Sequence, residues 1–334
     1  MINEIHFGDC RDSLRAMAAA GVKVQTCVTS PPYFGLRDYG HDGQIGQEET
    51  PEQFIAQLVD VFNCVRDVLA DDGTLWVNIG DTYAGQGGRG VQSGKEFESR
   101  ARGRQAICRS ARVKPSGDLK EKDLIGIPWM LAFALRADGW YLRQDVIWHK
   151  PNPMPESVTD RCTKAHEYVF LLSKGPRYFY DSEAVKEPVA ASTVSRLAQS
   201  TLAQQAGSTR VPGKTNGNMK AVGNGETRNR RSVWSINTQP YKGAHFAVFP
   251  SALVEPCILA GSRPGDVVLD PFMGSGTTAA VAVENGRLFI GCELNPDYKP
   301  LQDERIAGAR LAVEEAEAAI RAAAAQLPLF TEAA

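Results

Sequence analysis

A turn with several hydrogen-bonding groups follows an apolar segment near the start of the chain. Residues 22–28 are mostly apolar and predict a buried strand, and Thr29-Ser30-Pro31-Pro32-Tyr33 comes directly after it. Two consecutive prolines stop a strand and turn the next residues outward. The Ser30 hydroxyl and the Pro31 carbonyl are hydrogen-bond acceptors, and the prolines hold them in place. Taken alone, this pattern is most often a rigid surface loop.

A second group of residues with chemical potential lies near the C-terminus. Residues 267–278 read as a strand, a turn with Gly274-Ser275-Gly276, and the start of a helix. Small residues let the backbone approach a ligand, and a helix N-terminus offers free N–H groups. A second strand, Leu288–Cys292, ends at Glu293, whose carboxylate can accept hydrogen bonds from ribose hydroxyls. The third glycine of the dinucleotide fingerprint is missing, which disfavours NAD and FAD.

The elements around these turns alternate between strand and helix. Thr50 and Pro51 predict the start of a helix over residues 51–70, and Asp72-Gly73 is expected to end it. The other expected elements are strands at 74–79, 141–149 and 168–173, a helix at 122–138 and a last helix that ends near residue 325. This alternation indicates an α/β fold with a buried sheet.

Two polar, basic stretches interrupt the alternation. Residues 83–118 hold eight predicted surface cations and read as a solvated loop able to contact phosphates, and residues 184–232 are basic as well. We therefore divide the chain into a first catalytic part (1–82), a basic loop (83–118), a continued catalytic part (119–183), a recognition insert (184–232), a cofactor-binding part (233–300) and a C-terminal helix with a tail (301–334).

The composition is that of an ordinary globular protein. Of the 334 residues, 43% are hydrophobic and 23% charged, and the net charge of −2 argues mildly against a nucleic-acid binder. The seven cysteines form no C-x-x-C pair, so we expect no metal site and a reducing compartment. The N-terminus has no basic, apolar leader and no apolar run is long enough to cross a membrane, which predicts a soluble cytoplasmic protein of a bacterial or phage-infected cell.

The motifs and their order resemble the amino-methyltransferases of DNA, specifically the permuted β group. In that family the target-amine motif comes first, as Ser30–Tyr33 does here, and the cofactor loop comes last, as Asp270–Gly276 does. Further segments similar to the family are Gly8-Asp9-Cys10, Trp148-His149-Lys150-Pro151-Asn152-Pro153, His166-Glu167-Tyr168 and His245-Phe246-Ala247-Val248-Phe249-Pro250. The resemblance covers most of residues 5–180 and 233–298, without the two basic stretches.

The resemblance implies a fold, a cofactor and a set of site residues. The fold is the Rossmann-like methyltransferase fold, a mostly parallel twisted sheet with helices on both faces, and the cofactor is S-adenosyl-L-methionine. The residues expected at the cofactor are Asp9, Cys10, Phe249, Pro250, Asp270, Phe272, Gly274, Ser275, Gly276, Thr277 and Glu293. The catalytic residues expected are Ser30, Pro31, Pro32 and Tyr33.

These catalytic residues suit methylation of an exocyclic amine. Acceptors on both N–H groups, Ser30 and Pro31, would draw the nitrogen toward a tetrahedral geometry, and Tyr33 would stack on a base rotated out of the duplex. Transfer would be direct, without a covalent enzyme intermediate. In the family, serine at the first position is commonest in enzymes that methylate N4 of cytosine, so we expect that base, with N6 of adenine as the alternative.

The expected partner is double-stranded DNA, contacted by Lys150, Asn152, Arg228, Arg230 and Arg231. Two other function classes stay open: a non-catalytic DNA-binding protein on the same fold, and methylation of RNA or protein. Cys257 lies in an apolar helical pattern and is expected to be an inert core thiol, and His166-Glu167 is expected to order the base pocket.

The C-terminal tail suggests a second partner. Gln326-Leu327-Pro328-Leu329-Phe330 is similar to the short peptides by which bacterial DNA enzymes dock on the sliding clamp, apart from its proline. The alternative is that these apolar side chains fold back on the enzyme itself.

Overall fold

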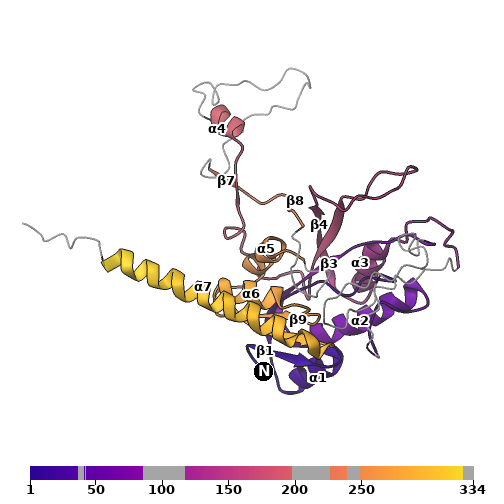
Figure 1. Cartoon of the computed structure of the whole chain (residues 1–334), viewed down its shortest axis with the longest axis horizontal. Coiled ribbons are helices and arrows are strands. Elements are labelled where there is room, and N and C mark those ends of the chain that lie inside the picture. The colour runs from indigo at the N-terminus through magenta and orange to yellow at the C-terminus, as the bar shows by residue number, and fades with distance from the viewer. Residues whose placement is uncertain (37–40, 42, 86–116, 198–225, 239–248, 326–334) are drawn as a thin grey trace, which may run out of the picture. The chain divides into compact units, whose positions relative to one another are not determined.

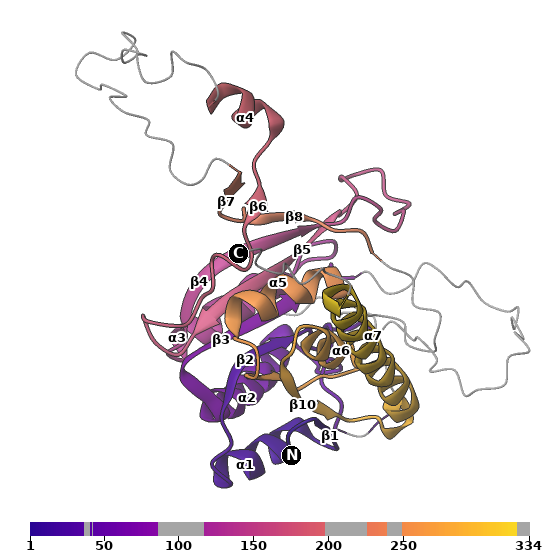
Figure 2. The ribbon, with the colours of Figure 1, turned by 90° about the vertical axis from the view of Figure 1, so that its left-hand side faces the viewer.

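The computed structural model describes residues 1–36, 41, 43–85, 117–197, 226–238 and 249–325. The chain divides into two compact units, one formed by residues 1–180 with 233–334 and one by residues 181–232. The larger unit holds an eight-stranded sheet with the order β1-β10-β9-β2-β3-β5-β4-β8 (Figures 1 and 2). Its strands are β1 (Glu4–Phe7), β2 (Val24–Thr29), β3 (Leu69–Ile79), β4 (Tyr141–His149), β5 (His166–Ser173), β8 (Val233–Ser235), β9 (Val267–Asp270) and β10 (Leu288–Glu293).

The sheet is mostly parallel, as predicted. Among its described strands, only β5 runs antiparallel to its neighbours β3 and β4, while the other adjacent strands pair in parallel. The residues of β2 and β3 are nearly all buried, as expected for strands that helices cover on both sides. The carboxyl ends of β1, β10, β9, β2 and β3 therefore lie along one edge, which is where ligands bind in open α/β sheets.

Helices cover both faces of this sheet. One layer is α1 (Cys10–Ala19), α2 (Pro51–Val68) and α3 (Ile127–Ala137), and the other is α5 (Ser251–Gly261), α6 (Thr277–Glu284) and α7 (Lys299–Ala325), which follows the short 3-10 helix η2 (Pro296–Tyr298) (Figures 1 and 2). The core lies between the first layer and the sheet, with Phe54, Leu58 and Phe62 of α2 fully buried. The predicted Thr50 cap and Pro51 start of α2 are present, together with a reciprocal hydrogen bond from Gln53.

Three predicted boundaries were wrong. The strand β3 starts at Leu69, not at residue 74, because Leu69 is already extended and pairs with Val24. Gly73 lies inside this strand, where a Cβ would come within 2.6 Å of the Leu69 side chain, so it permits close packing rather than ending a helix. The helix α3 starts at residue 127, not 122, because Lys122 and Gly126 have positive φ angles of 74° and 86°. The strand β5 begins two residues earlier than predicted, at His166.

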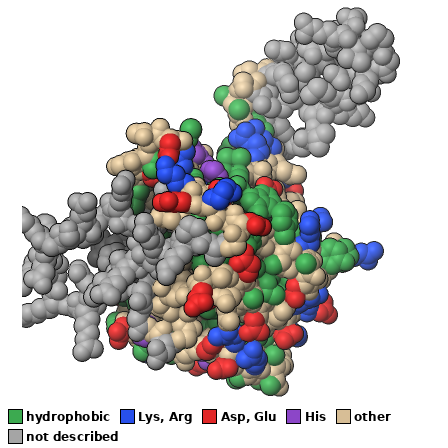
Figure 3. All heavy atoms as spheres, turned by 90° about the vertical axis from the view of Figure 1, so that its right-hand side faces the viewer, with side chains coloured by type: hydrophobic (Ala, Val, Ile, Leu, Met, Phe, Trp, Pro, Cys, Tyr) green, Lys and Arg blue, Asp and Glu red, His purple; other side chains and the backbone are tan. Residues whose placement is uncertain are grey.

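The smaller unit contains a short antiparallel pair, β6 (Glu187–Pro188) with β7 (Thr227–Arg228), and the helix α4 (Ala191–Leu197). Most of the predicted basic loop at 83–118 and the middle of the predicted recognition insert at 184–232 lie outside the described residues. Figure 3 shows acidic and basic side chains interspersed on one face of the molecule, with no broad basic patch among the described residues. No helix among the described residues is long and apolar enough to cross a membrane.

Candidate active site

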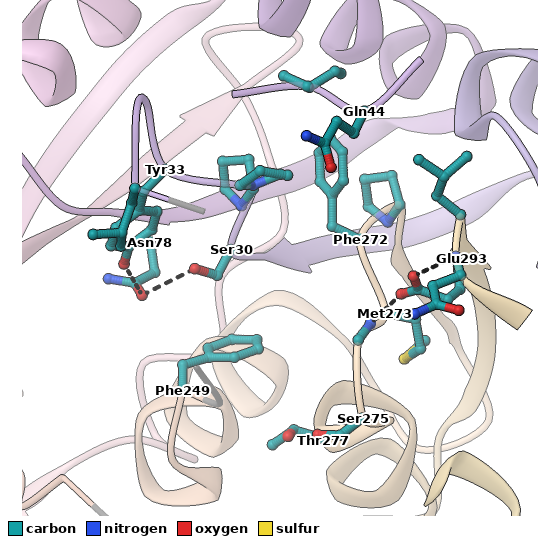
Figure 4. A pocket seen from close by; sticks show the side chains of 18 of the residues that line it. Ser30, Tyr33, Gln44, Asn78, Phe249, Phe272, Met273, Ser275, Thr277 and Glu293 are labelled. Atoms are coloured by element: carbon teal, nitrogen blue, oxygen red, sulfur yellow. Dashed lines mark hydrogen bonds between the residues drawn. The ribbon is translucent and has the colours of Figure 1, made fainter. Parts of the chain in front are cut away.

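A pocket of about 820 Å³ opens at the edge formed by the carboxyl ends of the parallel strands. It brings together residues from the two ends of the chain, so the predicted catalytic turn and the predicted cofactor loop line one cavity (Figure 4). The predicted site residues that line it are Asp9, Cys10, Ser30, Pro31, Pro32, Tyr33, Lys150, Asn152, Phe249, Phe272, Gly274, Ser275, Thr277 and Glu293. The rings of Phe249 and Phe272 both point into it (Figure 4).

Three predicted cofactor residues do not line the pocket. Pro250 is the residue before the first turn of α5, and Gly276 takes a left-handed conformation, φ 84°, before α6. Asp270 is fully buried beneath the loop. Its carboxylate accepts hydrogen bonds from the hydroxyls of Thr29 and Thr278, each at 2.6 Å, and from the Phe272 backbone N–H at 3.0 Å. Asp270 therefore joins the cofactor loop to the residue that precedes Ser30, and burial raises the pKa of its carboxyl group to about 6.

Glu293, at the end of β10, holds the glycine turn from the opposite strand. One carboxylate oxygen accepts the Gly274 N–H at 2.7 Å and the other accepts the Asn295 N–H at 2.8 Å (Figure 4). Gly274 has a φ of 54°, a conformation that favours glycine. Burial raises the pKa of the Glu293 carboxyl group to about 7. A carboxylate with two backbone donors keeps further lone pairs for a ligand's hydroxyl groups.

The catalytic turn is held by a polar network that sequence reasoning found only in part. Ser30 Oγ donates to Asn78 Oδ1 at 3.3 Å, and Tyr33 Oη lies 3.3 Å from the same oxygen and 2.7 Å from Glu167 Oε2 (Figure 4). The Tyr33 ring packs over Gly80, where a Cβ would come within 2.6 Å of it. Asn78 ends the apolar run of β3, which is the only sequence signal that could have marked it.

The chain belongs to the DNA methylase family. The family model matches residues 24–304, which include both motifs and the network between them. The predicted enzyme class, an S-adenosylmethionine-dependent DNA methyltransferase, is confirmed by this membership. The open classes of a non-catalytic protein and of an RNA or protein methylase are set aside by it.

Close relatives of this methylase are type II methyltransferases. M.SmaI of Serratia marcescens is 48% identical over 91% of this chain and 90% of its own length, and M.Cfr9I of Citrobacter freundii is 46% identical over 90% and 86%. Among solved structures, the cytosine-N4-specific PvuII DNA methyltransferase matches with a TM-score of 0.58, 18% identity and coverage of 94% and 93%. A DNA modification methylase of Thermus thermophilus, solved with S-adenosyl-L-methionine, matches with a TM-score of 0.54, 23% identity and coverage of 92% and 94%. These structures confirm the predicted fold.

The methylase also uses a helix that the sequence did not mark as functional. Gln302 of α7 donates to the Gly274 carbonyl at 2.7 Å, and Arg305 donates to the hydroxyls of Ser275, at 3.0 Å, and Thr277. The first turns of α7 thus fix the glycine turn from behind. An amphipathic Ala- and Glu-rich helix carries no pattern that distinguishes this role from ordinary packing.

Near the N-terminus, Asp9 and Cys10 lie where the chain enters the pocket. The Asp9 carboxylate caps α1, accepting the Arg11 N–H at 2.8 Å, and also pairs with the Arg11 guanidinium. This pairing keeps the pKa of the Asp9 carboxyl below its usual value. Burial raises the pKa of the Cys10 thiol to about 12, so Cys10 is neutral in the methylase.

The residues predicted to bind DNA fall into two groups. Lys150 lies in the pocket, where its ammonium group pairs with Glu167 and sits 4.3 Å from the centre of the Trp148 ring. Asn152 exchanges hydrogen bonds with the Thr238 backbone, at 2.9 and 3.2 Å. The arginines belong to the smaller unit, where Arg228 and Arg231 both pair with Glu187. Cys257 is a buried thiol of α5, as predicted.

Proposed function

We propose that this methylase transfers a methyl group from S-adenosyl-L-methionine to N4 of cytosine in duplex DNA. The observation that carries the proposal is the Ser30 hydroxyl, which lines the pocket and directs its own proton to Asn78. An oxygen held in this way offers its lone pairs to an amine. Serine at the first position of the turn favours cytosine, and N6 of adenine is the second candidate.

The residues of the pocket fit the cofactor. The turn at Gly274 lets the backbone approach a ligand closely, and Glu293 presents a carboxylate suited to ribose hydroxyls. Phe272 and Phe249 add apolar surface, and Asp9 with Cys10 line the wall toward the end of β1. When bound, S-adenosyl-L-methionine supplies an electrophilic methyl group on a sulfonium.

The chain's own contribution is orientation. A cytosine amine has its lone pair delocalised into the ring, so it needs acceptors for both of its N–H groups. Ser30 Oγ and the Pro31 carbonyl take these hydrogen bonds and turn the lone pair toward the methyl group. Tyr33, fixed by Asn78 and Glu167, gives the base a flat surface. The methylated nitrogen then releases one proton, which restores the neutral amine.

The proposed product is tested by mass spectrometry of digested DNA after incubation with the purified enzyme and the cofactor. N4-methylcytosine is expected. N6-methyladenine alone would overturn the choice of base and leave the role of the turn intact, whereas 5-methylcytosine would overturn both. Sequencing the DNA of cells that express the enzyme, with detection of modified bases, gives the recognition site for the experiments below.

We also propose a cytoplasmic enzyme that acts beside the bacterial nucleoid. Docking on a sliding clamp through Gln326–Phe330 stays a prediction, since that segment lies outside the described residues. Binding of a peptide of residues 322–334 to a bacterial clamp, with the Leu329→Ala, Phe330→Ala peptide as a control, tests it.

A further inference from the structure

The loop between β4 and β5, residues 150–165, extends from the edge of the sheet that carries the pocket (Figure 1). The body of the enzyme anchors it at several points. The Lys150 N–H donates to the Ala165 carbonyl at 2.8 Å, which closes the base of the loop, and Asn152 is tied to Thr238. Farther along, Lys122 pairs with Asp160 at 2.8 Å. The loop is therefore a fixed structure beside the pocket.

Within this anchored loop, one large apolar side chain is directed outward. Met154 is 88% exposed, the most exposed of the large hydrophobic residues described, and it lines the mouth of the pocket. Pro153 and Pro155 flank it. A proline fixes its own φ and restricts the residue before it to extended conformations, so Met154 has little backbone freedom. An unbranched thioether side chain held rigidly in water gains nothing from the fold, which indicates that it contacts something else.

The position of the catalytic turn suggests what that is. Ser30 lies inside the pocket, and a base stacked in a duplex cannot reach it, so the target base must leave the helix. The base that leaves creates a gap in the stack and an unpaired partner base. Apolar side chains, methionine among them, fill such gaps in other DNA-bending and base-extruding proteins. The flexible, polarisable methionine side chain adapts well to a space between bases.

We propose that Met154 enters the base stack of the DNA as the target base moves into the pocket, and so stabilises the extruded state. This inference rests on the proposed function only in that the enzyme must act on a base in duplex DNA. It holds equally for cytosine and for adenine. It assigns to the loop a part in substrate opening that is separate from the chemistry at Ser30.

The test compares two synthetic duplexes that carry the mapped recognition site. In one the target base is paired, and in the other it faces an abasic nucleotide, so it has no partner to leave. For Met154→Ala, kcat/KM on the paired duplex should fall about tenfold, because extrusion loses its stabilisation. On the duplex with the abasic nucleotide the loss should be less than about threefold, because little opening energy is needed there.

Two variants control this comparison. Met154→Leu keeps an apolar side chain of similar volume and should retain most of the activity on both duplexes. Ile320→Ala removes another exposed aliphatic side chain, 69% exposed on α7, and should change neither rate. Equal losses on the two duplexes for Met154→Ala, or no loss on either, would overturn the inference. A wild-type enzyme that leaves the paired duplex unmethylated would instead overturn the proposed function.

Discussion

The Ser30 hydroxyl donates its proton to Asn78 Oδ1 across 3.3 Å, and the surroundings of Asn78 determine this direction. The Asn78 Nδ2 group lies 3.1 Å from the Tyr168 carbonyl and 3.3 Å from the Glu167 carboxylate, and both are acceptors. The amide must therefore turn its oxygen toward Ser30. Because a hydroxyl has one proton, both lone pairs of Ser30 are left for the substrate amine.

Ser30→Ala should separate catalysis from cofactor binding. The acceptor is needed chiefly in the transition state, so kcat should fall about 100-fold or more while the Kd for S-adenosyl-L-methionine stays within about twofold. Gly274→Val should do the opposite, because its φ of 54° strains a β-branched residue and the added side chain blocks the backbone approach. Calorimetry and single-turnover rates measure the two effects. Normal turnover by Ser30→Ala would refute the proposed role of the turn.

Asn78→Asp tests whether the amide controls Ser30. The new carboxylate would lie beside Glu167, and two adjacent carboxylates raise the pKa of one of them. The protonated form restores a donor toward Glu167, and the ionised form does not. The ratio of the variant's kcat to that of the wild type should therefore be highest at low pH and should fall as the pH rises.

Asn78→Ala is the matched control for this pH profile. It removes the acceptor for Ser30 and carries no titratable group, so its activity should be low at every pH, in constant proportion to the wild type. A flat ratio for Asn78→Asp would show that Asn78 only fills space.

Cofactor affinity should depend on pH through Glu293. Burial raises the pKa of this carboxyl to about 7, so the free enzyme is largely protonated at that position below pH 7. Ribose hydroxyls donate to the ionised form, and binding therefore has to expel the proton. The Kd for S-adenosyl-L-methionine should rise as the pH falls below about 7, approaching about tenfold per pH unit.

Calorimetric titrations at a series of pH values measure this dependence. Glu293→Gln cannot ionise and sets an amide NH2 against a backbone N–H, so it should bind weakly at all pH values. A slope that remains in this variant near pH 6 would belong to Asp270, whose pKa is about 6. An unchanged slope would exclude Glu293 as its source.

The sequence predicted the pocket better where function depends on the backbone than where it depends on side-chain networks. Ser-Pro-Pro-Tyr and the turn at Gly274 are local patterns, because prolines and glycines set the conformation of their own neighbourhood. Both turns were located correctly and line one cavity. The order of strands and helices followed from periodicity in the same way.

The residues that support these turns were harder to find. Asn78 and Gln302 are single polar side chains on β3 and α7, and their partners are 48 and 28 residues away along the chain. Nothing local distinguishes them from ordinary surface polar residues until the sheet brings the strands together. Asp270 illustrates the converse: its motif was recognised, but its burial beneath the loop depends on the packing of β2 against β9.

The last prediction concerns the arginines of the smaller unit. Arg228 Nε and Arg231 Nε both donate to Glu187 Oε1, at 2.9 and 2.8 Å, and a guanidinium held at Nε can also contact a phosphate through its terminal nitrogens. Replacing Arg228, Arg230 and Arg231 with alanine should weaken DNA binding and lower the slope of log K against log salt by up to about 3. Affinity for S-adenosyl-L-methionine should not change.

Glu187→Gln should act in the opposite direction. It removes the negative charge that the two arginines share while keeping the size of the side chain, so DNA affinity should rise and its salt dependence should steepen. Fluorescence anisotropy over a salt series measures both variants on the same duplex. If the triple variant binds DNA as the wild type does at every salt concentration, the phosphate contacts lie elsewhere, and the cations of residues 83–118 become the next set to replace.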